Sequence, residues 1–213
     1  MKAREEILRR VGSALVAAPE VRLTEPDGDD GIRRDYAHTR ELPDRLALFV
    51  ERVENYRARV IRTGPDGVVA AVAKSLAGAR RTVVPSGLNP AWIPNDLGIV
   101  RDEPVLGAGD LDTVDAVLTG AVVGIAVTGT IVLDHTEGQG RRALTLVPDL
   151  HVCVVTADQI VGDVPEAISR LRSSVNSGRP LTWISGPSAT VDIELQRVEG
   201  VHGPRTLRVV LVE

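Results

Sequence analysis

Three short glycine-containing segments combine residue types that can hold a small anion or move a proton. They are Thr-Gly-Thr at 128–130, Ser-Gly-Pro-Ser at 185–188 and His-Gly-Pro at 202–204. Glycine lets backbone N–H groups approach a ligand closely, and serine and threonine add hydroxyl donors. A histidine titrates near neutral pH and therefore suits proton transfer. We expect the three segments to lie together around one pocket for an anionic ligand.

Two adjacent arginines, Arg141 and Arg142, follow the polar loop 134–140. Each guanidinium presents a planar fork of donors that matches the paired oxygens of a carboxylate or phosphate. We therefore expect the two side chains to clamp an anion. The alternative is that they form surface ion pairs with Asp or Glu, which is common among arginines.

The segment 181–194 predicts a buried strand followed directly by a loop of small residues. In open α/β sheets, ligands bind beyond the carboxyl ends of the strands, where such loops expose N–H groups and hydroxyls. Thr190 and Asp192 are candidate ligand-binding residues on this ground. A structural interpretation remains open, in which Ser188 caps a helix and Asp192 and Glu194 lie near its positive end.

Glu194 and His202 are the candidates for acid–base catalysis. A carboxylate or an imidazole can exchange a proton with a ligand that lies within hydrogen-bond distance. Around them, we expect the ligand to be held by Thr128, Gly129, Thr130, Arg141, Arg142, Ser185, Gly186, Pro187, Ser188, Thr190, Asp192 and Gly203.

Several catalytic and cofactor motifs are missing from the sequence. The loop at 185–188 lacks the lysine of a nucleotide-binding P-loop, and there is no GxGxxG fingerprint. Ser188, Asp192 and His202 include the residue types of a hydrolase triad, but no GxSxG turn accompanies them. His151 and Cys153 share one face of a predicted strand, but two ligands without a third make a poor metal site. We interpret both as core residues and predict no metal or cofactor in this chain.

The composition is that of a globular protein without a basic surface. Of the 213 residues, 43% are hydrophobic, and 25 Lys and Arg against 29 Asp and Glu give a net charge of -4. This balance, with only 2% aromatic residues, argues against nucleic-acid binding. The single cysteine cannot supply the thiolates of an iron–sulphur cluster. Neither a signal peptide nor a membrane-length apolar run is visible, so we expect a cytoplasmic protein with no membrane span.

The elements that must position these residues begin with two predicted helices. Apolar residues at helical spacing predict one helix over 2–17 and another over 43–59. Between them, 19–34 is rich in Pro, Gly and Asp and predicts an exposed linker. We therefore divide the chain into an N-terminal helix and linker at 1–34 and an α/β domain at 35–213.

From residue 60 onward, short β-branched runs alternate with helical patterns, which is typical of a mostly parallel sheet covered by helices. Strands are predicted at 60–62, 82–84, 98–100, 151–156, 181–184 and 207–212, with two more around a turn in 124–133. The clearest helices are predicted at 66–77, 110–119 and 164–174, with Asp110, Asp112 and Asp163 as N-caps. His38 and His135 fall in loops, without a partner that sequence can identify.

Four blocks taken together resemble the LUD-domain family, and the resemblance spans about residues 35–213. The blocks are AVTGTIVL at 126–133, GRRALTLVPDLHV at 140–152, SGPSATVDIE at 185–194 and VHGP at 201–204. The resemblance implies a three-layer α/β fold akin to the NagB/RpiA/CoA-transferase superfamily. It also implies a role beside two iron–sulphur proteins in oxidising L-lactate to pyruvate, with the clusters on those partners.

Val127 departs from the family pattern, in which the hairpin commonly carries Glu-Thr-Gly. In the related CoA transferases a glutamate is the nucleophile, and valine can neither attack a thioester nor hold a proton. The departure favours a ligand-binding or assembly role over autonomous catalysis. The function we expect is that of an accessory subunit that binds a small anionic metabolite. Two alternatives remain: an autonomous isomerase or CoA-transferase-like enzyme that uses Glu194 or His202, and a structural assembly protein whose N-terminal helix docks on a neighbour.

Overall fold

The computed structural model of the chain describes residues 3–17, 37, 39, 41–187, 189–191, 197–199 and 203–213. The chain divides into two units, Met1–Ala37 and His38–Glu213. In the first unit, helix α1 (Ala3–Ala17) pairs Glu6 with Arg9 and Arg10 along one side and exposes Ile7, Leu8 and Val11. No described helix is both long enough and apolar enough to cross a membrane.

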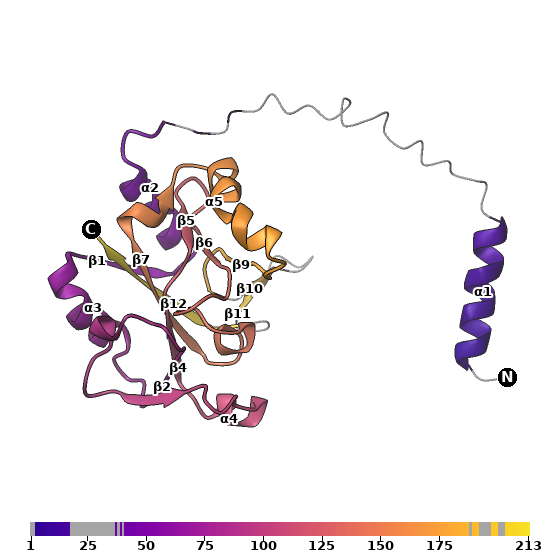
Figure 1. Ribbon diagram of the computed structural model, residues 1–213, viewed down its shortest axis with the longest axis horizontal. Helices are drawn as coiled ribbons and strands as arrows, with labels where there is room; N and C mark the ends of the chain where they lie inside the picture. Colours follow the sequence, from indigo (N-terminus) through magenta and orange to yellow (C-terminus); the bar gives the residue numbers. More distant parts are fainter. Residues whose placement is uncertain are drawn as a thin grey trace. The chain divides into compact units, whose positions relative to one another are not determined.

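Six parallel strands form the main sheet of the second unit (Figure 1). In spatial order they are β1 (Arg59–Thr63), β12 (Thr206–Val212), β7 (Leu150–Thr156), β4 (Ala116–Thr119), β2 (Arg81–Val84) and β3 (Gly98–Arg101). The central strands β7 and β12 are buried on both faces, which is why Val and Leu dominate them. The predicted α/β fold with a mostly parallel sheet and flanking helices is confirmed.

Helices cover both faces of the main sheet. On one face, α3 (Val68–Ser75) packs Val68 and Val72 against alternate residues of the strands, among them Val154 and Val210. On the other face, α2 (Arg45–Asn55) packs Phe49 and Val53 onto β7 and β12. The α2 helix begins after Asp44, whose side chain accepts a hydrogen bond from the backbone N–H of Ala47 at 2.9 Å.

A second, four-stranded sheet shares the α2 face of the main sheet. Its strands, in spatial order, are β8 (Ile160–Val161), β5 (Val123–Ile125), β6 (Thr130–Leu133) and β9 (Thr182–Ile184). Helix α5 (Val164–Asn176) packs Ala167 and Leu171 on this sheet, and its predicted N-cap Asp163 accepts from Val164 N at 2.7 Å.

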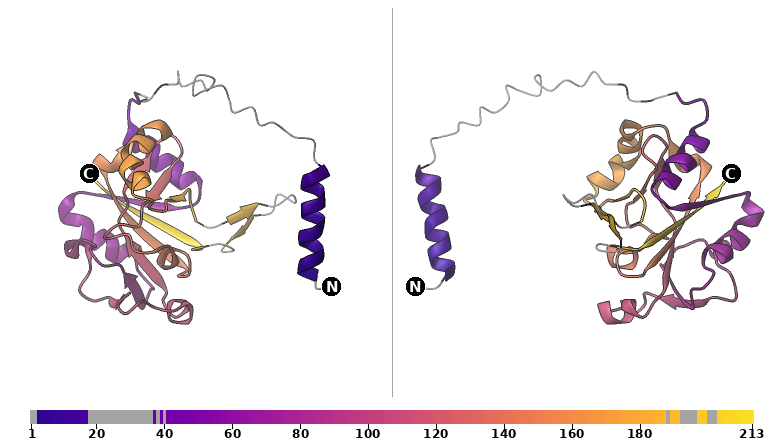
Figure 2. Two further views of the ribbon diagram at one scale, coloured as in Figure 1. Left: turned by 45° about the vertical axis from the view of Figure 1, so that its right-hand side comes forward. Right: turned by 180° about the vertical axis from the view of Figure 1, so that it is seen from behind.

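The remaining elements are short. Strands β10 (Ala189–Val191) and β11 (Arg197–Glu199) form an antiparallel hairpin that projects away from both sheets (Figure 2). The short helices are α4 (Ala108–Asp112) and the 3-10 turns η2 (Pro65–Gly67), η3 (Pro90–Trp92), η4 (Arg142–Thr145) and η5 (Ala157–Gln159).

The helix predicted over 110–119 is wrong. The chain forms α4 up to Asp112 and then the strand β4, whose residues are all buried. Asp110 is not the N-cap residue of α4 but its third residue, whose carboxylate accepts from the backbone N–H of the N-cap Gly107 at 3.0 Å in a capping box. Asp112, the other predicted N-cap, is the last residue of α4. Pairing with β2 and β7 decides the conformation of 116–119, because an apolar run of this length suits a helix or a strand equally well.

The strand predicted near 181–184 exists but belongs to the other sheet. It pairs antiparallel with β6 and is half-buried, so it is not a buried strand of the parallel sheet. The expectation that the loop at 185–188 follows the carboxyl end of a main-sheet strand is therefore wrong. The described residues beyond Ser188 continue as β10, not as a helix that Ser188 would cap.

Candidate functional site

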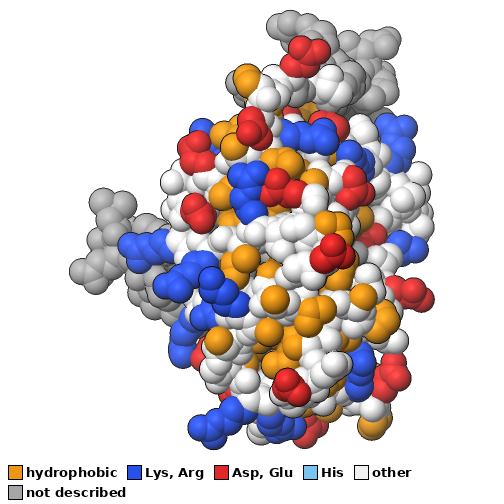
Figure 3. Space-filling view, turned by 90° about the vertical axis from the view of Figure 1, so that its left-hand side faces the viewer, with side chains coloured by type: hydrophobic (Ala, Val, Ile, Leu, Met, Phe, Trp, Pro, Cys, Tyr) orange, Lys and Arg blue, Asp and Glu red, His pale blue; other side chains and the backbone are white. Residues whose placement is uncertain are grey.

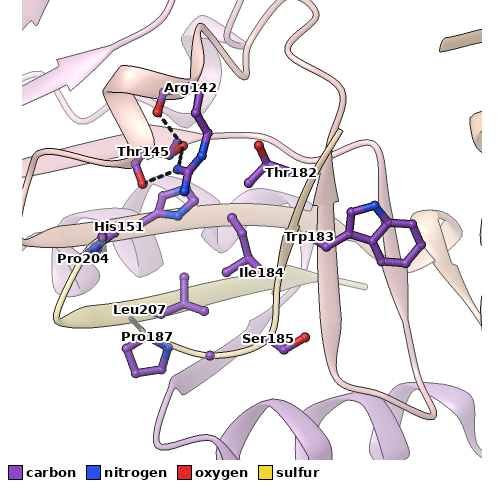
Figure 4. Close-up of a pocket in the computed structure, with 12 residues that line it drawn as sticks. Arg142, Thr145, His151, Thr182, Trp183, Ile184, Ser185, Pro187, Pro204 and Leu207 are labelled. Carbon is purple, nitrogen blue, oxygen red and sulfur yellow. Dashed lines mark hydrogen bonds between the residues drawn. The ribbon is translucent and has the colours of Figure 1, made fainter. Parts of the chain in front are cut away.

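A pocket of about 240 Å³ lies between the amino ends of β7 and β12 and the strand β9 with its following loop (Figure 4). We call it the Arg142 pocket. Its polar lining side chains are Arg142, Thr145, His151, Thr182 and Ser185, and Ile184, Pro187 and Leu207 add apolar surface. Trp183 points away from the other lining side chains and is 40% exposed. A pocket of this composition can hold a small molecule with one anionic and one apolar end.

Arg142 is the charged group of this pocket among the described lining residues. Its Nη1 donates to the backbone and hydroxyl oxygens of Thr145, each at 3.0 Å. The Nε and Nη2 atoms have no acceptor among the described residues. Burial lowers the pKa of Arg142, but guanidinium ionises so far above neutral pH that the side chain stays charged. A pair of charged donors is therefore available to an anion.

His151 lies beside the Arg142 guanidinium and is 2% exposed (Figure 4). Its Nε2 lies 2.8 Å from the hydroxyl oxygen of Thr119, at the end of the neighbouring strand β4. Burial, and secondly the charge of Arg142, lower the pKa of His151 to about 4. The imidazole is therefore neutral at pH 7, and its second ring nitrogen, Nδ1, has no hydrogen-bond partner among the described residues.

Parts of the three glycine-containing segments meet at this pocket. Residues 185–187 and 203–204 line it directly. Thr130 does not line it, but its Oγ1 lies 2.8 Å from Ser185 Oγ and accepts a hydrogen bond from Thr128 Oγ1 at 2.7 Å. The hydroxyls of Thr128 and Thr130 thus hold Ser185 in place without lining the pocket themselves.

Gly129 packs against helix α2 and is not at the pocket. It has a φ of 61°, and a Cβ at this position would lie 2.6 Å from the carbonyl carbon of Arg52. Neither Thr128 nor Gly129 lines the Arg142 pocket, and neither does Val127. The glycine of this hairpin is explained by the close approach of α2 to the turn.

Arg141 and Arg142 do not form one clamp. The Nε and Nη2 atoms of Arg141 donate to the two carboxylate oxygens of Asp102 at 2.7 and 2.9 Å, and Nη2 also donates to Leu106 O at 2.6 Å. This pairing with Arg141 holds the pKa of Asp102 below its ordinary value. Arg141 lines a different pocket, of about 260 Å³, where Pro85 and Asp102 follow the carboxyl ends of β2 and β3.

The loop that precedes the arginines is held by the buried carboxylate of Asp134. It accepts hydrogen bonds from Ser174 Oγ and Thr136 Oγ1, both at 2.6 Å, and from Gln139 Nε2 at 2.9 Å. Burial raises the pKa of Asp134, but these hydrogen bonds outweigh it and bring the pKa below its ordinary value. The network fixes the backbone that aims Arg142 into the pocket.

His135 links this loop to the pocket wall. Its Nδ1 donates to the carbonyl oxygen of Gly140 at 2.7 Å, since a carbonyl can only accept, and its Nε2 lies 2.8 Å from Thr182 Oγ1. Sequence reasoning found no partner for His135 and missed Thr119, Thr145 and Thr182. The signal present in the sequence was the alternation of side-chain direction along β7 and β9. It places His151 and Thr182 on the strand faces that line the pocket in the folded protein.

Some candidates lie outside the described residues, namely Ser188, Asp192, Glu194, His202 and His38. Thr190 lies in β10, and its side chain is not described. Their assigned roles stay predictions. Cys153 is a core residue with no exposed surface. Among the described residues, no three His, Cys, Asp or Glu side chains come together as metal ligands.

The chain is similar to a known domain family and to proteins with assigned names. Residues 109–212 match the model of the LUD domain. The chain is 52% identical over 167 residues to lactate utilization protein C of Deinococcus radiodurans, covering 78% of this chain and 79% of that protein. It is 28% identical over 165 residues to lactate utilization protein C of Geobacillus kaustophilus, covering 64% and 68%.

A solved structure shares the fold. The crystal structure of a DUF162 family protein from Deinococcus radiodurans aligns with a TM-score of 0.72 and 46% sequence identity. The alignment covers 79% of this chain and 96% of that one. Arg142 and His151 both lie within the residues that match the LUD domain.

Proposed function

This chain belongs to the LUD-domain family, and from that premise we propose that it serves L-lactate utilisation as an accessory component that binds a small carboxylate in the Arg142 pocket. The names of its relatives support the role in lactate utilisation. The observation that carries the binding role is the Arg142 guanidinium, which has two donor atoms without an acceptor among the described residues and lies beside a neutral His151.

The chemistry of the lining suits a hydroxy or keto acid of three carbons. L-Lactate and pyruvate each carry a carboxylate, an oxygen on the next carbon and a methyl group. The carboxylate pairs with Arg142, the neighbouring oxygen bonds to a hydroxyl such as Thr182 or Ser185, and the methyl group contacts Leu207. The pocket, about 240 Å³, is smaller than the roughly 300–1,000 Å³ sites typical of drug-sized ligands.

In this proposal the oxidation itself takes place on iron–sulphur partner proteins, which carry the clusters. The one cysteine of the sequence, Cys153, is buried, and burial raises the pKa of its thiol to about 12. A thiol in that state is not available as a thiolate ligand. Valine at position 127, where the family resemblance leads us to expect glutamate, also favours a binding role over nucleophilic catalysis.

Reconstitution with the iron–sulphur partners tests this proposal. We expect lactate-dependent electron transfer to fall when the chain is omitted and to fall to nearly the same level with Arg142→Met. Arg172→Met removes one positive charge from the exposed side of α5 and should retain the wild-type rate. A rate that does not depend on the presence of the chain contradicts the proposal.

A further inference from the structure

A second cavity, of about 460 Å³, lies at the edge of the main sheet, around the amino end of the edge strand β1 and between the carboxyl ends of α2 and α3. Successive residues of a strand point to opposite faces, so Leu207 lines the Arg142 pocket and Arg208 lines this one. The cavity is bounded by the start of β1, by Lys74 and Ser75 at the end of α3, and by Glu54. Figure 3 shows the face that carries α3 and β1, where Lys and Arg side chains gather.

The cavity concentrates positive charge. Arg59 and Arg208 lie at facing positions of the neighbouring strands β1 and β12, and Lys74 adds a third cation. Like charges at facing positions of a sheet repel one another. Glu54 is the carboxylate among the described lining residues, and no ion pair joins it to the three cations there. The described lining residues therefore carry a net charge of +2.

Two buried donors in this cavity have no partner among the described residues. Ser75 is 1% exposed, and its hydroxyl oxygen makes no hydrogen bond. The Nε atom of Arg208 is also buried and unpartnered, while its Nη1 donates to the carbonyl oxygen of Ser75. Buried polar atoms in folded proteins nearly always have a hydrogen-bond partner. These two donors on adjacent elements therefore point to an acceptor that the described residues do not provide.

We propose that this cavity, the Arg208 pocket, binds a phosphate group. A phosphate near neutral pH carries up to two negative charges, which matches the net charge of the lining. Its oxygens can accept from the Ser75 hydroxyl, from Arg208 Nε and from Arg59 at the same time, whereas a carboxylate offers only two oxygens. Val60 and Ile61 give the cavity an apolar surface that the carbon skeleton of a phosphorylated molecule can contact.

Isothermal titration calorimetry on the full chain at constant ionic strength tests this site. The probes are inorganic phosphate and glycerol 3-phosphate, and we expect saturable binding at one site. Tighter binding of glycerol 3-phosphate identifies a phosphorylated small molecule as the ligand, and tighter binding of inorganic phosphate identifies the free ion. Absence of saturable binding for both probes overturns the proposal.

Matched variants locate the binding. Ser75→Ala removes one hydroxyl from α3 and should weaken phosphate binding about tenfold, and Arg208→Met should weaken it at least a hundredfold. Arg142→Met and Arg172→Met should bind phosphate as the wild type does, which separates this site from the proposed carboxylate site. Wild-type affinity in Ser75→Ala and in a folded Arg208→Met overturns the proposal.

Discussion

His151 lies beside Arg142, where burial makes a second positive charge costly. Its pKa is about 4 in the folded protein, against an ordinary value of 6.5. Between these two values the unfolded chain binds a proton at this residue and the folded chain does not. The free energy of unfolding therefore falls as the pH drops from 6.5 to 4. The shift corresponds to about 3 kcal/mol.

Urea unfolding at pH 7 and at pH 4.5 measures this dependence. His151→Gln keeps an amide near Thr119 but has no group that titrates, so we expect it to lose most of the stability difference between the two pH values. Asp134, whose pKa is lowered, loses its contribution only below its ordinary pKa of 3.8 and does not affect this window. A variant that keeps the full wild-type difference contradicts the assignment to His151.

Cys153 should be inert in the folded protein. Its side chain has no exposed surface, its Sγ lies 3.5 Å from Gly120 O, and burial raises the pKa of the thiol to about 12. Alkylation requires an accessible thiolate. We expect iodoacetamide to leave the native protein unmodified over hours at pH 8 and to label it fully in denaturant, as read by mass spectrometry. Rapid labelling without denaturant would show that the core around β7 opens readily.

At the scale of elements, local patterns predict what local forces decide. The sequence predicts α5 together with its N-cap Asp163, because a side-chain cap and an apolar stripe on one side of a helix are both patterns of residues close together in the sequence. It does not predict the conformation of 116–119 or the partner of 182–184, since each depends on strand pairing across more than 30 residues. Sequence pattern identifies a strand but does not say which sheet it joins.

For the candidate site too, the sequence predicts the local features and not those that depend on contacts between distant residues. The loops of small residues at 185–187 and 203–204 are recognisable in the sequence, and in the structure both line the Arg142 pocket. The divergence of Arg141 and Arg142 was not visible, because it depends on Asp102 and Leu106, which lie about 35 to 39 residues away along the chain. His151 was correctly read as buried, but its place at the pocket wall follows from how β9 packs across the main sheet.

The turn at Gly129 offers a matched test of how the hairpin is held. Gly129 and Gly178 both have positive φ values, 61° and 69°, but a Cβ at Gly129 meets the backbone of α2, whereas a Cβ at Gly178 has no atom within 4 Å. Gly178→Ala should lower the free energy of unfolding by about 1 kcal/mol, from backbone strain alone. Gly129→Ala should lower it by about 3 kcal/mol, because overpacking adds to the strain. Equal losses in urea unfolding would contradict the packing of this turn against α2.

At the scale of the whole molecule, the α/β unit carries two pockets with different chemistry. One holds a single guanidinium beside a neutral imidazole, and the other holds three cations and two donors that have no partner within the described part of the chain. We assign a small carboxylate to the first and a phosphate group to the second. Leu207 and Arg208 are neighbours in β12, so one strand contributes a residue to each pocket.

The binding of L-lactate and pyruvate to the purified full chain tests the central proposal most directly. Arg142→Met should fold normally, because among the described residues the Arg142 side chain bonds only to Thr145 in its own turn. We predict that titration calorimetry detects one site for at least one of the two acids in the wild type and in Arg172→Met, and binding at least tenfold weaker in Arg142→Met. Wild-type affinity in Arg142→Met, or no binding of either acid to the wild type, would contradict it.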